Sequence, residues 1–564
     1  MSNHKLTRRD FINTGAASAI AAATVNAKDK TPELAEPTQN LKQKLTGDWQ
    51  ARGSKGAVVA GGKASVAAGL GILKSGGNAA DAAAATLIAL TVTDYRLYCF
   101  GGEVPIIHYN AKEGHTEVIA GQGVAPKLAT FAHFEKRRIP GTGGEPAAVP
   151  AVVDACLTLI DRHGTATFEQ IATPTMKILS RGKVQWRKDM RTSLGRLIDA
   201  EKQSKGDRKS GLKRVADYFY RGPLAKELVE WAKENSCLIR DDDMAAHVTR
   251  IEEPETTDYR GHTVCKCGAW TQGPYLLQSL RMLERFDLKK MGYHSTDTIH
   301  VAVESMKLAL ADRDRYYADP LFETVPMKQM LSDDYTNMRR DLIDMDKASM
   351  RLRPGDPHNM KALLENEQRD HATSKPNDTT TCITGDIHGN VVAATPSGWG
   401  GVVAGKTGIW MGTRLQSFNN WKDHPNCIEP GKRPRITLTP TIVLKDNKPV
   451  AAFSVAGGDM QDQATLQMLL NHIEFGMNPS QVVTAPHYGT NHLIGSFRQT
   501  RPSLGSLTVQ DTLDKQIVAE LKTRGHHLRT TGGTMSYRTA MSIYSEGVLH
   551  VAGDRRAGRN AMAI

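Results

Sequence analysis

The sequence has no apolar run long enough to cross a membrane. Its longest nearly apolar stretch, residues 82–92, is about half of the roughly 20 residues that a membrane-spanning helix requires. Aromatic residues make up only 6% of the chain, but 40% hydrophobic and 23% charged residues are ordinary for a folded globular protein. This composition excludes collagen-like, mucin-like and disordered chains. We therefore expect a folded protein with a large core and no membrane span.

Cysteine is scarce, and its distribution excludes two kinds of site. The chain has 7 cysteines, of which only Cys265 and Cys267 are close together. An odd, dispersed set argues against a disulfide framework and against a four-thiolate zinc site. The doublet His526-His527 and the scattered aspartates also lack metal-ligand spacing. The sequence predicts no metal and no other cofactor, and it leaves the redox state of the cysteine pair open.

Acidic residues are outnumbered, which gives a formal net charge of +12. Such a charge favours either an anionic partner, such as nucleic acid, or a solvated basic surface. The densest basic groups are short, at residues 136–138 and 289–290. No aromatic-interleaved basic stripe accompanies them. The pattern favours a solvated surface, and we expect no nucleic acid partner.

The N-terminus has the order of a bacterial export signal. Arg8 and Arg9 precede a weakly apolar, alanine-rich stretch at residues 16–23, and a small residue, Ala27, ends the segment. Adjacent arginines before a modestly apolar region resemble the twin-arginine class, with a basic disordered tail as the alternative. The prediction is a signal peptide at residues 1–27, a linker at residues 28–55, the twin-arginine export machinery as a partner, and a periplasmic or secreted mature protein.

From residue 56 onward, strand patterns and helix patterns alternate. The first strand is expected at residues 57–60, followed by a helix at residues 64–75 that ends at Gly76-Gly77. Asn78 is then placed to cap a second helix that continues to residue 92. Further helices are expected at residues 150–163, 169–181 and 296–317, the last of them amphipathic and half buried.

The composition changes after a polar segment at residues 340–378, which is typical of an exposed connection. Beyond it the pattern predicts strands at residues 380–384, 391–395, 439–444 and 450–455. Helices are expected at residues 463–475 and 510–523. Strand-rich segments flanked by helices on both sides of this connection indicate a layered α/β domain.

Thr379 stands where the polar connection meets the next strand. A threonine hydroxyl is a poor nucleophile without a base beside it, and cleavage of the preceding peptide bond would create that base as its own α-amine. The ordinary pKa of such an amine, about 7.7–8.0, suits general-base work. The alternative is a plain strand edge, because threonine favours strands. Cys382, three residues on, is expected to face the core on the opposite side of that strand.

Several motifs along the whole mature chain occur in the order found in one family. They include the helix junction at residues 76–83, the helix at residues 299–313, the ungapped stretch at residues 379–390, and the later motifs at residues 431–434, 439–441, 456–458, 475–478 and 485–486. Together they resemble the gamma-glutamyltransferase family of N-terminal nucleophile hydrolases.

This resemblance implies a four-layer αββα sandwich formed by two chains from one precursor. Self-cleavage between Asp378 and Thr379 would leave a large subunit ending at residue 378, with its folded part at residues 56–378, and a small catalytic subunit at residues 379–564. Thr379 would be the nucleophile, and Ser397 would support it where the family usually has threonine. Gly457 and Gly458 would hold the oxyanion through their backbone N–H groups.

The residues expected to recognise an amino-acid head depart from the family pattern. Gln122 stands where an arginine is expected, Thr437 is the remaining member of a hydroxyl pair, and Ser417 replaces an acidic residue. Arg414 is an added cation, to be interpreted either as an anchor for a substrate carboxylate or as part of a structural ion pair. Trp399 is interpreted as lining the pocket or as an ordinary core or rim residue.

The sequence therefore predicts a self-processing amidohydrolase or acyltransferase that acts on a small carboxylate-bearing amide. Two alternatives stay open. One is a true gamma-glutamyltransferase and glutathione hydrolase with a rebuilt carboxylate site around Arg414 and Thr437. The other is an uncleaved periplasmic scaffold without activity.

Overall fold

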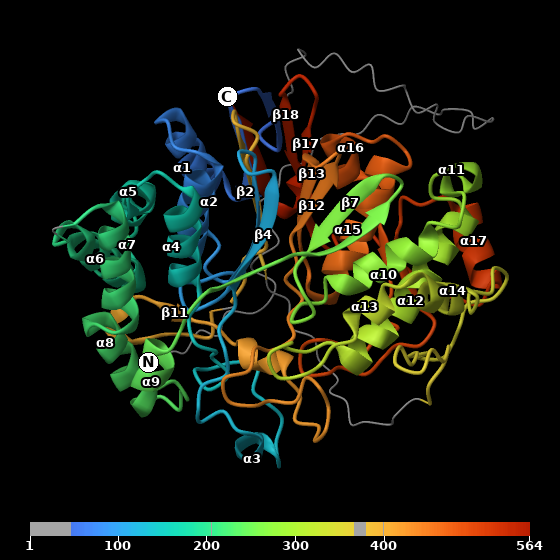
Figure 1. Cartoon of the computed structure of the whole chain (residues 1–564), viewed down its shortest axis with the longest axis horizontal. Coiled ribbons are helices and arrows are strands. Elements are labelled where there is room, and N and C mark those ends of the chain that lie inside the picture. The colour runs from blue at the N-terminus through green and yellow to red at the C-terminus, as the bar shows by residue number, and fades with distance from the viewer. Residues whose placement is uncertain (1–46, 205, 366–378, 399) are drawn as a thin grey trace, which may run out of the picture. The chain divides into compact units, whose positions relative to one another are not determined.

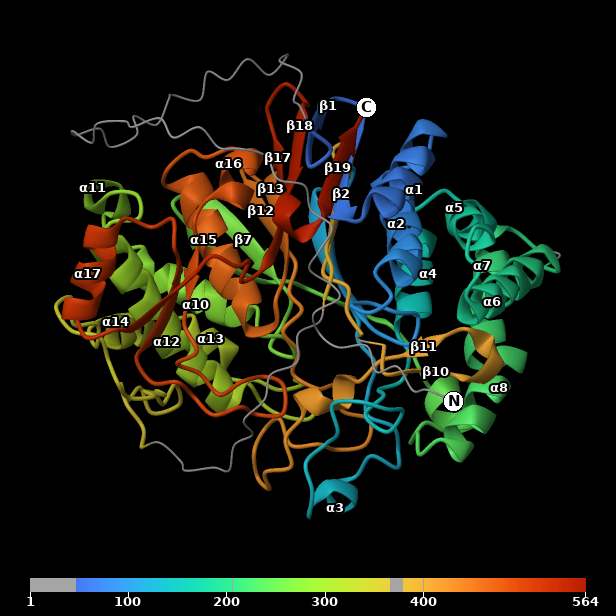
Figure 2. The same cartoon turned by 180° about the vertical axis from the view of Figure 1, so that it is seen from behind.

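The computed structural model describes residues 47–204, 206–365, 379–398 and 400–564. All of these belong to one unit that spans Asn40–Ile564. The predicted export signal, most of the linker, Asp378 and Trp399 lie outside the described residues. Figures 1 and 2 show the chain from its two sides.

Two antiparallel seven-stranded sheets form the centre of the fold. The first has the strand order β19-β2-β8-β9-β3-β4-β5 and the second β1-β18-β17-β13-β12-β7-β6. The first sheet consists of β19 (Arg559–Ala563), β2 (Gly56–Gly61), β8 (Cys382–Asp386), β9 (Val391–Ala394), β3 (Val104–Asn110), β4 (His115–Gly121) and β5 (Arg250–Glu252). The second consists of β1 (Gln50–Gly53), β18 (Leu549–Gly553), β17 (Tyr537–Ile543), β13 (Lys448–Ala456), β12 (Thr441–Lys445), β7 (His262–Lys266) and β6 (Glu255–Tyr259). Each sheet takes strands from both sides of the connection before Thr379.

The two sheets pack face to face through alternate residues of their strands. Val59 and Ile383 of the first sheet lie in one buried cluster with Ile442 and Met541 of the second. Their chain neighbours, such as Cys382, belong to a different cluster that faces helices, as the two-residue alternation of a strand requires. The predicted core position of Cys382 is therefore confirmed. Cys265 and Cys267 are free thiols in the core between the sheets.

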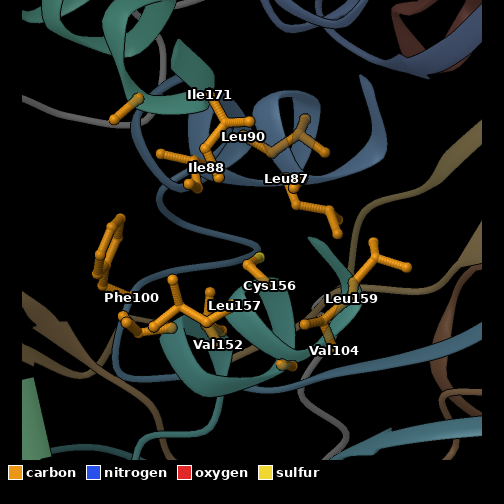
Figure 3. Packing of buried hydrophobic residues seen from close by; sticks show 14 of the residues in the cluster. Leu87, Ile88, Leu90, Phe100, Val104, Val152, Cys156, Leu157, Leu159 and Ile171 are labelled. Carbon is orange, nitrogen blue, oxygen red and sulfur yellow. The ribbon is translucent and has the colours of Figure 1, made fainter. Parts of the chain in front are cut away.

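Helices cover the outer face of each sheet and complete the expected αββα sandwich (Figures 1 and 2). The first sheet is covered by α1 (Lys63–Lys74), α2 (Ala79–Thr93) and α4 (Val152–His163), and α5 (Phe168–Ser180), α6 (Gln185–Lys202), α7 (Arg208–Tyr220) and α8 (Pro223–Glu234) pack outside these helices. The second is covered by α10 (Pro274–Leu283), α15 (Gln461–Ile473) and α16 (Pro479–Thr484), with α12 (Thr296–Tyr316) packed on α10 and α17 (Lys515–Thr523) packed on α12. Figure 3 shows Leu87, Ile88 and Leu90 of α2 near Val152 and Cys156 of α4 in the first of these layers.

Shorter elements connect these layers. They are α3 (Phe131–Phe134), α9 (Asp241–Ala245), α11 (Leu288–Met291), α13 (Met327–Met330), α14 (Asp333–Arg340), the pair β10 (Val402–Val403) and β11 (Trp410–Met411), and the small sheet of β14 (Tyr488–Gly489), β15 (Ser506–Gln510) and β16 (His527–Thr531). Single 3-10 turns are η1 (Gly405–Thr407), η2 (Arg414–Ser417), η3 (Gly458–Met460) and η4 (Arg555–Ala557). The described part of the expected connection, residues 341–365, contains no helix or strand. In the part of the chain that the structure describes, no helix combines the length and the apolar character needed to cross a membrane.

The junction between α1 and α2 forms as the sequence predicts. Gly76 has a φ of 90°, which a glycine adopts without a steric penalty. The N–H of Gly77 returns to the carbonyl of Ile72 at 3.0 Å and closes α1. The Asn78 side chain accepts from the N–H of Asp81, and the Asp81 carboxylate accepts from the N–H of Asn78, so both form a capping box at the start of α2.

Two predictions about helices are wrong in detail. The helix α12 is not half buried, because 18 of its 21 residues are buried. Its polar face is covered by neighbouring segments that pair with its charges, as Arg339 does with Asp312 at 3.1 Å. The helix expected to begin at residue 510 begins at Lys515, because residues 506–510 form β15 and Asp514 caps the helix. Periodicity alone did not separate the strand from the helix that follows it.

Candidate active site

Thr379 lies three residues before the first residue of β8, Cys382, and its side chain is fully buried. Its Oγ1 donates to Ser397 Oγ at 3.3 Å, and its N–H donates to the carbonyl of Leu97 at 3.4 Å. Since β8 lies between β2 and β9, the residue is held at the N-terminal end of an interior strand of the first sheet. A hydroxyl at this position is thus held against a second hydroxyl in a site shielded from solvent.

The backbone of Thr379 is strained. Its φ is 109°, whereas the other described non-glycine residues with positive φ lie between 49° and 64°. Those values belong to the left-handed helical region, but 109° lies outside it and is a genuine outlier for a β-branched residue. Conformations of this kind cost on the order of 1–3 kcal/mol and persist only when the surroundings enforce them. The strained torsion is about the N–Cα bond of Thr379, which adjoins the peptide bond that the sequence predicts to be cleaved.

The hydroxyl of the next residue, Thr380, binds a different partner. Its Oγ1 donates to Asp94 Oδ2 at 2.6 Å, and its N–H donates to the carbonyl of Pro396 at 2.9 Å. Asp94 also accepts from Arg559 Nη1 at 3.1 Å. Of the two adjacent threonines, Thr379 is therefore the one whose hydroxyl faces Ser397.

Ser397 is fixed through its backbone to Glu103. The N–H of Ser397 donates to the carbonyl of Glu103 at 2.9 Å, and the N–H of Glu103 donates back at 3.0 Å. Gly102 permits this approach, because a Cβ there would lie 2.2 Å from the carbonyl oxygen of Ser397. The serine hydroxyl is consequently positioned by main-chain contacts that cannot move without breaking the bridge.

Arg414 connects the two residues a second time, through their side chains. Its Nε donates to Glu103 Oε1 at 2.6 Å and its Nη2 donates to Ser397 Oγ at 2.7 Å. The guanidinium is buried and lies 5.4 Å from the ring centroid of Phe497. Since Glu103 already compensates its charge, the geometry is that of a buried ion pair that orients Ser397. This is the structural alternative to a substrate anchor.

Gln461, the first residue of α15, touches two of the predicted hydroxyls. Its amide nitrogen lies 3.3 Å from Thr379 Oγ1 and 3.4 Å from Thr437 Oγ1. Turning the amide over lets its NH2 donate to the carbonyls of Thr437 at 2.8 Å and Val455 at 3.0 Å. We adopt this orientation because it satisfies both ends of the amide. The side-chain oxygen then faces both hydroxyls and can accept from Thr437 Oγ1, while Thr379 Oγ1 donates to Ser397.

A buried ion pair holds the start of α15. Lys266 Nζ donates to Asp462 Oδ1 at 2.7 Å, to the Thr439 carbonyl at 2.9 Å and to Thr441 Oγ1 at 2.8 Å. Burial raises the pKa of Asp462 to about 6 and lowers the pKa of Lys266, while the contact between them offsets part of both effects. The pair joins β7, β12 and α15, and so fixes Gln461 beside Thr379.

Gly457 and Gly458 form the turn between β13 and α15. Their φ values are 143° and 58°, which only glycine adopts at low cost. They line a cavity of about 360 Å³, to which Phe497 also contributes. The turn continues through residue 460 to Gln461, so it connects this cavity to the residue that lies beside Thr379. Both glycines thus lie beside the cavity, and their backbone N–H groups are the ones that the family resemblance predicts to bind the oxyanion.

The remaining predicted recognition residues are buried but less closely connected. Gln122 follows β4 and donates to the carbonyl of Gly123 at 2.8 Å, and its Oε1 has no hydrogen-bond partner in the described structure. Ser417 ends η2, and its hydroxyl likewise has no partner among the described residues. Thus the structure brings together Thr379, Ser397, Arg414 and Thr437, whereas no described contact joins Gln122 or Ser417 to Thr379.

One polar cluster elsewhere has the residue types of a metal site. Ligand atoms of His300, Glu304 and His526 lie within 4.8 Å of one another. However, His300 Nδ1 and His526 Nε2 are hydrogen bonded at 2.9 Å, and Arg353 Nη2 donates to Glu304 Oε2 at 2.8 Å. These hydrogen bonds engage the atoms that would otherwise coordinate a metal ion. The spacing of the residues in the sequence did not reveal this cluster, because His526 is far from α12 in the chain and lies beside it only in the folded protein.

Sequence reasoning also missed Glu103 and Gln461. Glu103 is an acidic residue between apolar neighbours at the start of β3, and such a residue requires a buried partner. That signal points to an ion pair without naming Arg414, which is 311 positions away. Gln461 follows the glycine pair closely in sequence, but nothing in its local pattern indicates a contact with Thr379.

Comparisons with known proteins agree with this arrangement. The sequence profile of the family described as Gamma-glutamyltranspeptidase matches residues 65–198 and 208–564. The glutathione hydrolase proenzyme of Bacillus subtilis (strain 168) is 29% identical over 534 residues, covering 88% of this chain and 89% of the relative. The acylase ACY 1 proenzyme of Pseudomonas sp. (strain SE83) is 27% identical over 587 residues, covering 96% and 98%.

Solved structures show the same fold along most of the chain. Structures of LmbA2991 superpose with a TM-score of 0.83 at 32% identity, covering 92% of this chain and 100% of the other. A cephalosporin acylase from Bacillus halodurans superposes with a TM-score of 0.77 at 25% identity, covering 94% and 99%. Since the family profile covers most strands of both sheets and the residues that contact Thr379, the chain belongs to the gamma-glutamyltranspeptidase family and is an amidohydrolase or acyltransferase of that family.

Proposed function

We propose that the chain is a precursor that cleaves itself between Asp378 and Thr379, and that Thr379 then cleaves small amides through an acyl-enzyme. The observation that carries the proposal is the strained φ of 109° at Thr379 together with its 3.3 Å contact to Ser397 Oγ. Cleavage of the preceding bond releases the strain and frees the α-amine. The names of the relatives, glutathione hydrolase proenzyme and acylase proenzyme, support a processed precursor.

The proposed reaction uses the α-amine of Thr379 as the base. The amine takes the proton from Oγ1 as Oγ1 bonds to the amide carbon, and the N–H groups of Gly457 and Gly458 bind the resulting oxyanion. The C–N bond then breaks, and the α-ammonium gives its proton to the departing amine. Water attacks the ester, and its proton returns through the amine. The free acid leaves and Thr379 is regenerated; an acceptor amine in place of water gives transfer.

Substrate choice follows from the altered recognition residues. Gln122 offers a neutral amide where a cation would hold a glutamate carboxylate, and Arg414 is already paired with Glu103. Ser417 stands where an acidic residue would hold the α-ammonium of a glutamyl group, so that ammonium loses its partner. We therefore propose a related carboxylate-bearing acyl group without the α-amine in preference to a gamma-glutamyl group. Membership of an enzyme family favours catalysis over the inactive scaffold. The N-terminal segment supports export by the twin-arginine route, and hence a periplasmic or secreted enzyme.

A substrate profile tests this proposal. The purified enzyme is assayed on anilides that share the leaving group and differ in the acyl group, namely gamma-glutamyl, glutaryl and oxamate-like acyl groups. We expect turnover of at least one of the last two at a kcat/KM about tenfold or more above that of the gamma-glutamyl anilide. A preference for the gamma-glutamyl compound would instead favour the alternative of a carboxylate site rebuilt around Arg414 and Thr437.

A further inference from the structure

The cavity beside the glycine pair is lined on its outer side by the small sheet of β14, β15 and β16. Thr508 of β15 and Arg529 of β16 are paired neighbours in this sheet, and both line the cavity. Leu507 and Val509, which alternate with Thr508, are buried in the core on the other face. The sheet therefore presents its polar face to the cavity and its apolar face to the helices.

Arg529 supplies a cation to this cavity. Its side chain is exposed, and it forms no ion pair or hydrogen bond with any residue that the structure describes. The acidic group in the lining, Asp459, is already compensated, because Arg313 Nη1 lies 2.8 Å from its Oδ1 and the N–H of Ser496 donates to its Oδ2 at 3.0 Å. The cavity thus has a guanidinium available to an anion, beside hydroxyls such as those of Thr500 and Thr508.

The position of the cavity indicates which part of the substrate it would hold. It contacts Gly457 and Gly458, where the reacting carbonyl would lie, but Gln122, Ser417 and Thr437 do not line it. Phe497 stands between the cavity and Arg414, since its ring lines the cavity and also lies against the guanidinium. The groups expected around the acyl head are therefore separate from the cavity. The remaining part of an amide substrate is the amine that departs.

We propose that this cavity is the amine-side subsite and that Arg529 binds a carboxylate on the departing amine. A volume of about 360 Å³ is at the lower end of the roughly 300–1,000 Å³ range of small-molecule sites. An amine of the amino-acid or aminobenzoate type has the size and charge that the cavity fits. The guanidinium recognises a carboxylate through two parallel N–H donors, which a neutral carboxamide cannot accept equally well. This inference rests on the proposed function.

The test compares two amides that share one acyl group. The amine is 4-aminobenzoate in one and 4-aminobenzamide in the other, so that they differ in a single charge. We measure the ratio of kcat/KM for the carboxylate to that for the carboxamide. In Arg529→Gln we expect this ratio to fall about tenfold, mainly through KM, because a charged hydrogen bond is lost. In Arg529→Glu the ratio falls further.

The matched control is Lys522→Gln, which removes one exposed positive charge from α17 without altering the cavity lining. We expect its ratio to stay within about twofold of the wild type. Self-cleavage of the Arg529 variants into two chains shows that they fold. Unchanged ratios in both Arg529 variants would overturn the subsite while leaving the proposed function intact. A wild-type enzyme that hydrolyses neither amide would overturn both.

Discussion

Arg414 donates to Ser397 Oγ at 2.7 Å while the same guanidinium is paired with Glu103. Ser397 Oγ in turn lies 3.3 Å from Oγ1 of Thr379, the proposed nucleophile. A cation from η2, an acid just before β3 and a hydroxyl that follows β9 are thus joined to the segment that leads into β8. Loss of any member changes the position of the hydroxyl that faces Thr379.

Replacing Ser397 tests the hydroxyl itself. We expect Ser397→Ala to slow self-cleavage and to lower kcat by about 10- to 100-fold, because a hydrogen bond to a polarised group is lost at the reacting atom. Ser397→Thr keeps a hydroxyl, on the residue type that the family usually has at this position, and should retain most of the rate. Equal rates for Ser397→Ala and the wild type would show that the hydroxyl has no role.

The Arg414 pair distinguishes a positioning residue from a substrate anchor. If Arg414 positions Ser397, Arg414→Met lowers kcat and self-cleavage for every acyl group. If it anchors a substrate carboxylate, KM rises only for carboxylate-bearing acyl groups and self-cleavage is unchanged. We expect the first result, measured by steady-state kinetics on charged and neutral acyl anilides and by the rate of precursor cleavage.

The ion pair of Arg414 with Glu103 also leads to a prediction about the free energy of unfolding. Arg414→Met leaves Glu103 buried without its ion-pair partner and should destabilise the fold by about 3–5 kcal/mol. Adding Glu103→Gln removes the uncompensated charge and should recover part of that loss without restoring kcat. Urea unfolding of the two variants measures the difference. Equal stability of both would show that the pair is not buried in the active protein.

Some features of the fold and of the site could be predicted from the sequence, and others could not. The helix junction at Asn78 and the strands around residue 450 follow from local capping and alternation, which act over a few residues. Ser397 could be placed because the family resemblance implies a supporting hydroxyl 18 positions after Thr379. Glu103 and Arg414 could not, because they are joined by a contact across the fold. The burial of α12 was also missed, because its charges are neutralised by partners that sequence periodicity does not reveal.

Replacing Gly458 tests the turn beside the cavity. Its φ of 58° closely matches the 64° of Gly476, and a Cβ at Gly476 meets nothing within 4 Å. Alanine at either position pays a similar backbone cost, on the order of 1–2 kcal/mol. We expect Gly458→Ala to lower kcat by about 10- to 100-fold through displacement of the oxyanion donors, whereas Gly476→Ala retains its kcat. Similar losses of kcat in both would exclude a role specific to the turn.

Buried neutral histidines make the fold sensitive to acid. Burial, and then the charge of Arg538, lower the pKa of His487 to about 2, and neither of its ring nitrogens has a hydrogen-bond partner in the described structure. A folded-state pKa below the unfolded value of about 6.5 means that this stability is complete above pH 6.5 and is lost as the pH falls. Near pH 5 the loss is about 2 kcal/mol.

Thermal unfolding between pH 7 and pH 5 measures this effect. We expect the wild-type Tm to fall over this range and the fall to be smaller in His487→Gln, which has no proton to bind. Other buried histidines contribute the remaining slope, among them His108, whose pKa is lowered to about 3. An identical pH dependence in the variant and the wild type would contradict the assignment to His487.

The most direct test of the central claim is the intact mass of the purified wild-type protein beside that of Thr379→Ala. The account predicts two wild-type chains, the smaller beginning at Thr379, and a single uncut chain without amide turnover for the variant. A wild-type enzyme that hydrolyses amides as one uncut chain, or a Thr379→Ala variant that still cleaves itself and turns over substrate, would contradict it.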